Sequence, residues 1–158
     1  MERHLSVLRM LYDVLEGAGV NWAVTGSLGL ALQGVPLEPH DVDVQTDEAG
    51  AYRIAALFAD RVVRPVTFSA KAGMRSHFGA LDIDGLTVEV MGDVQHQRAD
   101  GSWEPPPDLW RIRRWVDIAG IRVPVLSLEH ERDAYAKMGR TERVALISRA
   151  LEAQGSVR

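Results

Sequence analysis

Hydrophobic residues recur along the chain at two spacings, and these spacings predict its helices and strands. Over residues 2–18, leucines and a tyrosine recur every three or four positions, which is typical of a helix with one buried face. Shorter patterns predict four more helices, over 27–33, 48–59, 128–138 and 142–153. The last three follow Asp47, Ser127 and Thr141, which are residue types that cap helix N-termini.

Short runs rich in β-branched residues predict seven strands, over 22–25, 41–45, 62–68, 78–83, 86–91, 111–118 and 121–126. Asp84-Gly85 fits a two-residue type I′ turn, and Pro65 indicates an edge strand. Residues 70–77 are predicted to be a mobile loop, and 95–109 an irregular loop. The pattern predicts a single α/β (α+β) domain over 1–158: a small mixed sheet with helices packed on one face in a core of residues 1–94, then a hairpin and C-terminal helices over 110–158.

Composition narrows the classes of protein and partner. The chain has 158 residues, 46% hydrophobic and 25% charged, as expected of one globular domain. It has no cysteine, which excludes disulfides and cysteine-bound metals. There is no apolar run long enough to cross a bilayer and no secretory signal, so we expect a cytoplasmic protein without membrane contact. The net charge of −4 disfavours a long nucleic acid as partner.

Carboxylates alternate with valines in two of the predicted strands. Asp41 and Asp43 share one strand face while their valine neighbours point into the core, with Cα atoms about 7 Å apart. This spacing suits two divalent cations, and aspartate is otherwise a poor strand former. Glu89 also stands opposite two core valines, so it would complete a three-carboxylate site if its strand pairs with 41–45. The alternative is that these residues are solvated positions on amphipathic strands.

A glycine-serine turn lies between the strand 22–25 and the helix 27–33. Gly26 would let the backbone approach a phosphate closely, and the Ser27 hydroxyl could donate to it. A Gly-Ser pair is also an ordinary start of a helix. Followed about 15 residues later by the aspartate pair, however, it describes a triphosphate opposite magnesium.

Three segments together resemble the nucleotidyltransferase superfamily of DNA polymerase β: TGSLGLALQG, HDVDVQTD and LTVEVMGD. The likeness is greatest to small bacterial lincosamide and aminoglycoside nucleotidyltransferases, and it extends over residues 20–93. It implies that Gly26 and Ser27 bind the phosphates of an NTP such as ATP. It further implies that Asp41 and Asp43 hold two Mg²⁺ ions, and that Glu89 ligates one of them and acts as general base.

The C-terminal part adds two candidate residues. Lys137 and Arg140 match a Lys-and-Arg motif that antibiotic-modifying relatives carry on a late helix, which implies a role in nucleotide binding. Glu142 and Arg143 stand where those relatives carry Lys-Asp, so the resemblance does not define the acceptor site. Alternatively, Lys137 and Arg140 are cations that stabilise a helix C-terminus.

The sequence therefore predicts a two-metal nucleotidyltransferase that moves NMP from an NTP to a hydroxyl group and releases pyrophosphate. We expect a small-molecule or protein acceptor rather than nucleic acid, because the best basic stripe, Arg111 and Arg113 on one strand face, is short. A pocket between the 95–109 loop, with Trp103, and the C-terminal helices would hold the acceptor. The alternatives are a catalytically silent NTP-binding or regulatory (antitoxin) module and a metal-dependent nuclease. The oligomeric state stays open.

Overall fold

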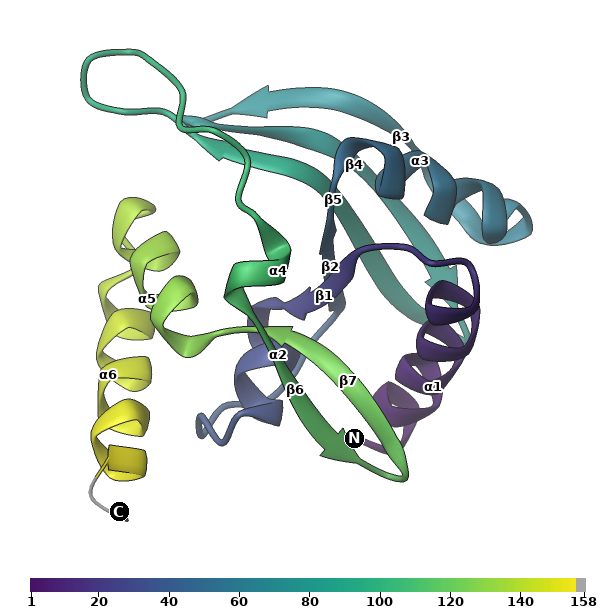
Figure 1. Ribbon diagram of the computed structural model, residues 1–158, viewed down its shortest axis with the longest axis horizontal. Coiled ribbons are helices and arrows are strands. Elements are labelled where there is room, and N and C mark those ends of the chain that lie inside the picture. Colours follow the sequence, from purple (N-terminus) through teal and green to yellow (C-terminus); the bar gives the residue numbers. More distant parts are fainter. Residues whose placement is uncertain (156–158) are drawn as a thin grey trace.

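The computed structural model describes residues 1–155, which form a seven-stranded mixed sheet with helices on both of its faces (Figure 1). The α-helices are α1 (Glu2–Gly17), α2 (Gly26–Leu32), α3 (Glu48–Leu57), α4 (Leu109–Ile112), α5 (Leu128–Lys137) and α6 (Thr141–Gly155). The strands are β1 (Trp22–Thr25), β2 (Val42–Thr46), β3 (Val62–Lys71), β4 (Met74–Ile83), β5 (Leu86–His96), β6 (Arg113–Ile118) and β7 (Ile121–Leu126). This architecture confirms the predicted mixed α/β fold, but the helices lie on both faces of the sheet and not on one, because α4 and the pair α5 and α6 pack in clusters apart from the main core.

The strand order is β3-β4-β5-β2-β1-β7-β6. Two neighbouring pairs are parallel, β2 with β5 and β1 with β7, and the other four are antiparallel. The strand that contains Pro65 lies at one edge, as predicted, because proline has no backbone N–H to donate to a neighbouring strand. Strand β2, which carries the predicted carboxylate motif, is the central strand of the sheet.

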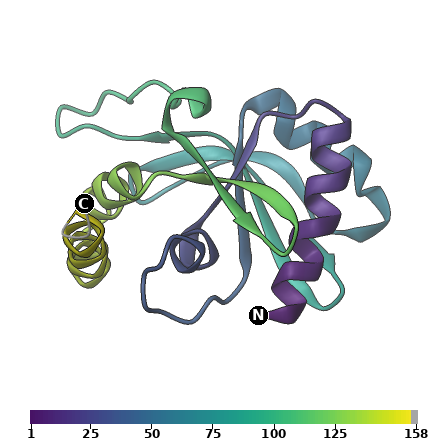
Figure 2. The ribbon, with the colours of Figure 1, turned by 60° about the horizontal axis from the view of Figure 1, so that its bottom comes forward.

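The helices pack in three hydrophobic clusters, of which the smallest joins α4 to β1 and β7. Helices α1 and α3 cover one face and form the main core with valines and leucines of the strands. A second cluster joins α2 to α5 and α6 through Leu30, Tyr135 and Ile147. The pair α5 and α6 lies at the opposite end of the molecule from α1 and α3 (Figures 1 and 2). The second sheet face is thereby left partly open beside α5 and α6. No helix within residues 1–155 is long and apolar enough to cross a membrane.

The segment 70–77 is not the mobile loop that its composition predicts. Strand β3 continues to Lys71 and β4 begins at Met74, and these two residues pair across the turn. The turn residues Ala72 and Gly73 both have positive φ, 51° and 76°. Alanine rarely adopts such a φ, so Ala-Gly is a weak turn signal in sequence. The long β3–β4 hairpin extends the open sheet face well beyond the prediction.

The prediction that Arg111 and Arg113 form a basic stripe on one strand face is also wrong. Arg111 lies on the short helix α4 rather than on a strand. Arg113 is buried, and its guanidinium lies 4.0 Å and 5.1 Å from the ring centroids of Trp110 and Trp115. These contacts engage the Arg113 charge in cation–π packing. Arg111 and Arg113 therefore do not form a cationic face on a strand.

Candidate active site

A row of side chains crosses the open face of the sheet at its centre. Strand pairing places Thr25 opposite Asp43, and Asp43 opposite Glu89. The adjacent residues Val42, Val44, Val88 and Val90 point the other way, into the main core. This geometry is the one that the alternation of valines and carboxylates predicts, and it places Asp43 and Glu89 on neighbouring strands, about 5 Å apart at the backbone.

The carboxylates of this row act on one another. Burial, followed by the charges of Glu89 and Asp41, raises the pKa of Asp43 to about 7, while Arg143 opposes the shift. Burial and the charge of Asp41 raise the pKa of Glu89, against the lowering effect of Arg64. The carboxylates of Asp41, Asp43 and Glu89 therefore repel one another when they are ionised, and a bound cation would reduce this repulsion.

The donor chemistry of this row suits a hard cation. Asp43 and Glu89 are carboxylates, the ligands that Mg²⁺ prefers in proteins. No set of three or more His, Asp or Glu side chains within residues 1–155 is arranged to hold a metal ion. Asp41 lies just before β2 and is exposed, whereas Asp43 and Glu89 are half-buried. Metal binding would therefore require these side chains to adjust, with Asp43 and Glu89 as the ordered pair.

Gly26 brings the backbone directly against Asp43. Its φ is +68°, and a Cβ atom built on it would lie 2.2 Å from Asp43 Oδ2. Both features require glycine, because an L-residue is strained at this φ and its side chain would overlap the carboxylate. The predicted phosphate turn and the predicted metal ligand are thus in contact.

Ser27 is buried and already has a hydrogen-bond partner in the protein. Its Oγ accepts a hydrogen bond of 3.0 Å from the backbone N–H of His40. This bond ties the Gly-Ser turn to the segment that leads into Asp41. Ser27 therefore has a clear structural role, and its contact with phosphate stays a prediction.

Glu131 of α5 is a site residue that sequence reasoning missed. It is buried, it accepts a hydrogen bond from Thr25 Oγ1, and it lines the same cleft as Gly26 and Asp43. Burial raises its pKa to about 7; the bond from Thr25 opposes the shift and the charge of Asp43 adds to it. In sequence Glu131 is one acidic residue among several on a polar helix, and only the docking of α5 onto the β1–α2 turn distinguishes it.

The raised pKa of Glu131 predicts a pH-dependent stability. Between pH 4.5 and about 7 the folded protein retains a proton that the unfolded chain releases, so the contribution of this group to stability is lost as pH rises through that window. Glu131→Gln removes the cost, and we expect it to raise the free energy of unfolding by about 1–3 kcal/mol at pH 8 and by much less at pH 4.5. Urea unfolding of both proteins at the two pH values checks this. Equal differences at both pH values would contradict it.

Arg143 of α6 is the second residue missed. Its Nη1 atom is buried and has no hydrogen-bond partner among the residues that the structure describes. Its charge lowers the pKa of both Asp43 and Glu131, and its guanidinium lies 5.6 Å from the ring centroid of Tyr135. A buried donor without a partner is costly, so this atom is a candidate ligand for an anion. The sequence shows Arg143 only as a departure from the family motif.

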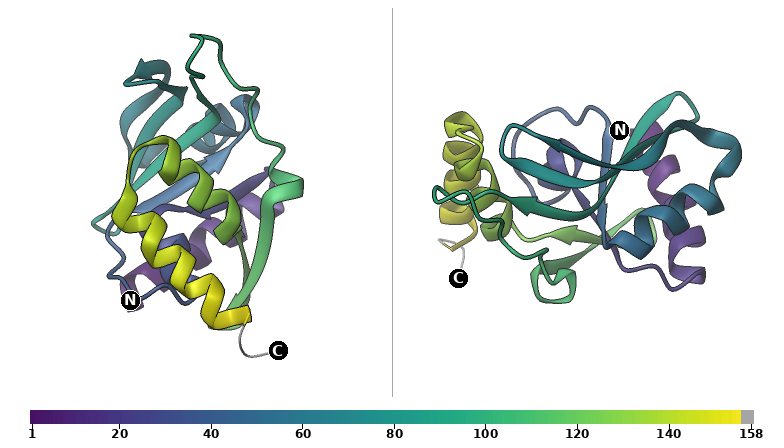
Figure 3. Two further views of the ribbon diagram at one scale, coloured as in Figure 1. Left: turned by 90° about the vertical axis from the view of Figure 1, so that its left-hand side faces the viewer. Right: turned by 90° about the horizontal axis from the view of Figure 1, so that it is seen from above.

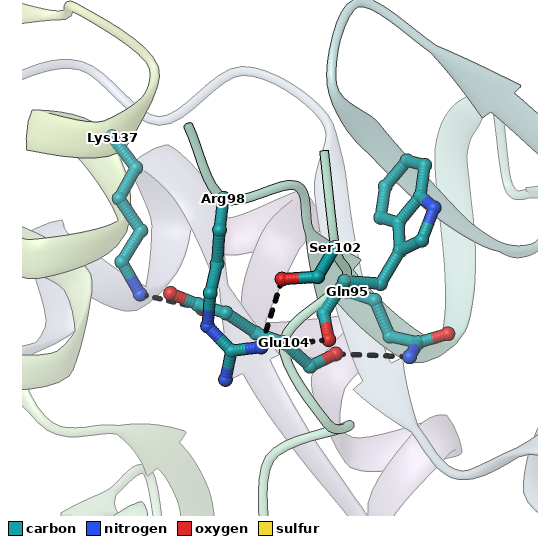
Figure 4. Close-up of polar contacts among 6 residues, drawn as sticks. Gln95, Arg98, Ser102, Glu104 and Lys137 are labelled. Carbon is teal, nitrogen blue, oxygen red and sulfur yellow. Dashed lines mark hydrogen bonds and ion pairs between the residues drawn. The ribbon is translucent and has the colours of Figure 1, made fainter. Parts of the chain in front are cut away.

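The two predicted C-terminal cations differ in position. Arg140 lines the cleft, with its Nε bonded to Glu142 at 2.8 Å. Lys137 instead forms an ion pair of 2.8 Å with Glu104, on the loop that reaches α5 (Figure 3). The side-chain amide of Gln95 donates a hydrogen bond of 2.9 Å to the backbone oxygen of Glu104 (Figure 4). Lys137 and Gln95 together therefore fix the position of Glu104 on this loop. Their nucleotide-binding roles stay predictions, and the position of Arg140 fits the role better.

The predicted acceptor pocket beside the 95–109 loop is small. The space between Glu104, Pro105 and Lys137 measures about 50 Å³, room for a water molecule or two. Trp103 does not line it. The cleft at the carboxylate row is larger, about 220 Å³, and is lined by Gly26, Asp43, Glu131 and Arg140 among others. The cleft at the carboxylate row therefore offers more room for a substrate than the space beside the loop.

Fold and site together define a nucleotidyltransferase domain, and comparison with known proteins specifies the family. The family model for aminoglycoside-2''-adenylyltransferase matches residues 7–148, and the chain belongs to this family. No curated protein matches the chain.

Solved structures agree with this assignment. A protein from Thermotoga maritima, provisionally classed as a nucleotidyltransferase, is 49% identical over 96% of this chain and 94% of its own, with a TM-score of 0.85. The lincosamide antibiotic adenylyltransferase LnuA, solved with lincomycin, has a TM-score of 0.58 at 11% identity, covering 89% and 94% of the two chains. ANT(2'')-Ia in complex with adenylyl-2''-tobramycin has a TM-score of 0.63 at 12% identity, covering 97% and 92%. The last two share the fold.

Proposed function

We propose that this protein transfers the nucleoside monophosphate of an NTP, with ATP favoured by the family, to a hydroxyl group of a small acceptor and releases pyrophosphate. The observation that carries the proposal is the cross-strand pair of Asp43 and Glu89, with the backbone of Gly26 held against Asp43. A phosphate at Gly26 would lie beside the carboxylates that would bind its counter-ion. The buried Nη1 of Arg143, which has no hydrogen-bond partner within residues 1–155, supports a phosphate on the same side.

The residues of the row suggest a division of labour. Gly26 leaves room for the triphosphate, while Arg143 and Arg140 pair with its oxygens. Glu89, half-buried and with a raised pKa, takes the proton of the acceptor hydroxyl. The hydroxyl oxygen then bonds to the α-phosphorus as the bond from that phosphorus to pyrophosphate breaks. Mg²⁺ bound by Asp41, Asp43 and Glu89 would neutralise phosphate charge and acidify the hydroxyl.

Turnover with labelled ATP tests the proposal. ATP labelled at the α- or the γ-phosphorus is incubated with Mg²⁺ and a panel of hydroxyl acceptors. We expect the α-label on the acceptor and the γ-label in pyrophosphate. ATP binding without pyrophosphate release would favour the silent regulatory module, and cleavage of RNA or DNA without ATP would favour the nuclease. Movement of the γ-label to the acceptor would contradict nucleotidyl transfer.

Removal of the Arg143 charge should weaken nucleotide binding. A hydrogen bond to a charged group contributes about 1.5–3 kcal/mol, so Arg143→Gln should raise the Kd for ATP and Mg²⁺ by about 10- to 100-fold. Arg149→Gln is the matched control, because Arg149 is exposed on the same helix. Calorimetric titration measures both. A Kd for Arg143→Gln equal to that of the control would refute the role of Arg143.

A further inference from the structure

A second cavity opens on the same sheet face as the carboxylate row, over β3 and β4. It measures about 250 Å³ and is lined by Arg64, Ser69, Lys71, Met74, Arg75, Ser76 and Phe78. Met74 lines both this cavity and the cleft at Asp43, so the two spaces adjoin. Ligand sites for drug-sized molecules measure about 300–1,000 Å³, so this one suits a compact molecule.

The cavity continues the carboxylate row beyond Glu89. Strand pairing places Glu89 opposite Ala80, and Ala80 opposite Arg64. Arg64 is thus two strands from Glu89, about 10 Å at the backbone, with only the short side chain of Ala80 between them. Its guanidinium lies 4.7 Å from the ring centroid of Phe78, which lines the same cavity.

The position suits the acceptor rather than the nucleotide. Gly26 and the Arg143 guanidinium lie on the β1 and α6 side of Asp43, where the triphosphate is proposed to bind. In an in-line displacement the attacking oxygen approaches the phosphorus opposite the leaving group. An acceptor would therefore approach from the β4 and β3 side of Glu89, which is where this cavity lies.

The positive charge of the residues that line this cavity favours an acceptor with a negatively charged group. It contains three cations, Arg64, Lys71 and Arg75, and no carboxylate. Arg75 already has partners in the protein. Its Nε–H donates a hydrogen bond of 3.0 Å to the side-chain oxygen of Gln95, and its guanidinium lies 4.3 Å from the ring centroid of Trp103. Arg64 and Lys71 have no ion-pair partner within residues 1–155. The cavity therefore presents positive charge that an anionic group could neutralise.

We propose that this cavity is the acceptor subsite, and that the acceptor is a small hydroxyl compound with a carboxylate or phosphate group held by Arg64 and Lys71. This inference rests on the proposed nucleotidyl transfer. The acceptor hydroxyl oxygen bonds to the α-phosphorus, its proton passes to Glu89, and the bond from phosphorus to pyrophosphate breaks. A polycationic aminoglycoside would be repelled by the same lining.

Matched acceptors test the charge preference. Glycerol, glycerate, glycerol 3-phosphate, tobramycin and tRNA are compared as acceptors with ATP and Mg²⁺. We expect kcat/KM at least about 10-fold higher for one or both anionic compounds than for glycerol, and the two anions separate carboxylate from phosphate recognition. Arg64→Gln should raise the KM of the anionic acceptors by about 10- to 100-fold and leave the KM of ATP near the wild-type value. Arg122→Gln, an exposed arginine on β7, is the control.

Direct binding separates this inference from the proposed reaction. Calorimetry with α,β-methylene-ATP and Mg²⁺ measures the affinity for glycerate and glycerol 3-phosphate without turnover. Arg64-dependent binding without any transfer would support the subsite while refuting the proposed reaction. Transfer that prefers tobramycin or tRNA would overturn the subsite while supporting nucleotidyl transfer. An equal effect of Arg64→Gln on glycerol and on the anions, or no binding of either anion, would also overturn it.

Discussion

Asp43→Asn should reduce nucleotidyl transfer by at least about 10³-fold, because it removes the carboxylate at the centre of the row. Asp43 is paired with Glu89 on one side and with Thr25 on the other, and it contacts the Gly26 turn. An amide of the same shape preserves the packing and loses the charge. The rate of pyrophosphate release with a saturating acceptor measures the effect, and Asp13→Asn, at an exposed position on α1, is the control.

The same variant should be more stable than the wild type in the absence of metal. The pKa of Asp43 is raised to about 7, so the folded protein retains its proton between pH 3.8 and 7 and pays for ionisation above that range. Asparagine has no such cost. We expect the free energy of unfolding at pH 8 to rise by about 1–3 kcal/mol, with little difference at pH 3.8. A variant that is both inactive and destabilised at pH 8 would point to a structural role for Asp43.

Gly26→Ala should reduce transfer by about 10²-fold or more, since even a methyl group at this position overlaps Asp43 Oδ2 at 2.2 Å. Either the carboxylate or the turn must move, and both belong to the proposed site. The left-handed φ adds about 1–2 kcal/mol of destabilisation. Steady-state kinetics with ATP and thermal unfolding measure the two effects separately.

Gly19→Ala isolates the steric effect in Gly26→Ala. Gly19 has the same φ of +68°, but a Cβ there would meet no atom of residues 1–155 within 4 Å. Both variants should therefore lose the stability that the left-handed φ costs, Gly26→Ala should lose more because of its overlap with Asp43, and only Gly26→Ala should lose activity. Similar activity in the two variants would mean that the close approach of Gly26 to Asp43 has no part in the reaction.

The sequence predicts the centre of the site because its signals there are local. Because side chains alternate along a strand, the valines that enter the core place Asp43 and Glu89 on the opposite face of their strands. The sequence alone leaves open whether these two strands pair. The structure shows that they do, as β2 and β5. The Asp84-Gly85 turn was equally local, with φ values of 52° and 84° at its two residues, as a type I′ turn requires.

The surroundings of the site depend on tertiary contacts that a sequence pattern does not contain. Glu131 and Arg143 reach the cleft only because Leu30 and Tyr135 join α2 to α5 and α6 in one apolar cluster. Arg64 joins the row because a bulged β3 pairs with β4, and the Ala72-Gly73 turn that permits this carries no strong signal. Residues that complete a site from distant elements are therefore the ones that sequence reasoning missed.

A crystal of the protein soaked with Mn²⁺ and α,β-methylene-ATP tests the central claim most directly. Anomalous scattering locates the metal independently of the protein coordinates. We predict at least one Mn²⁺ within about 2.5 Å of carboxylate oxygens of Asp43 and Glu89, together with a phosphate of the nucleotide at Gly26. Manganese and nucleotide bound elsewhere, with these carboxylates free of metal, would contradict the account.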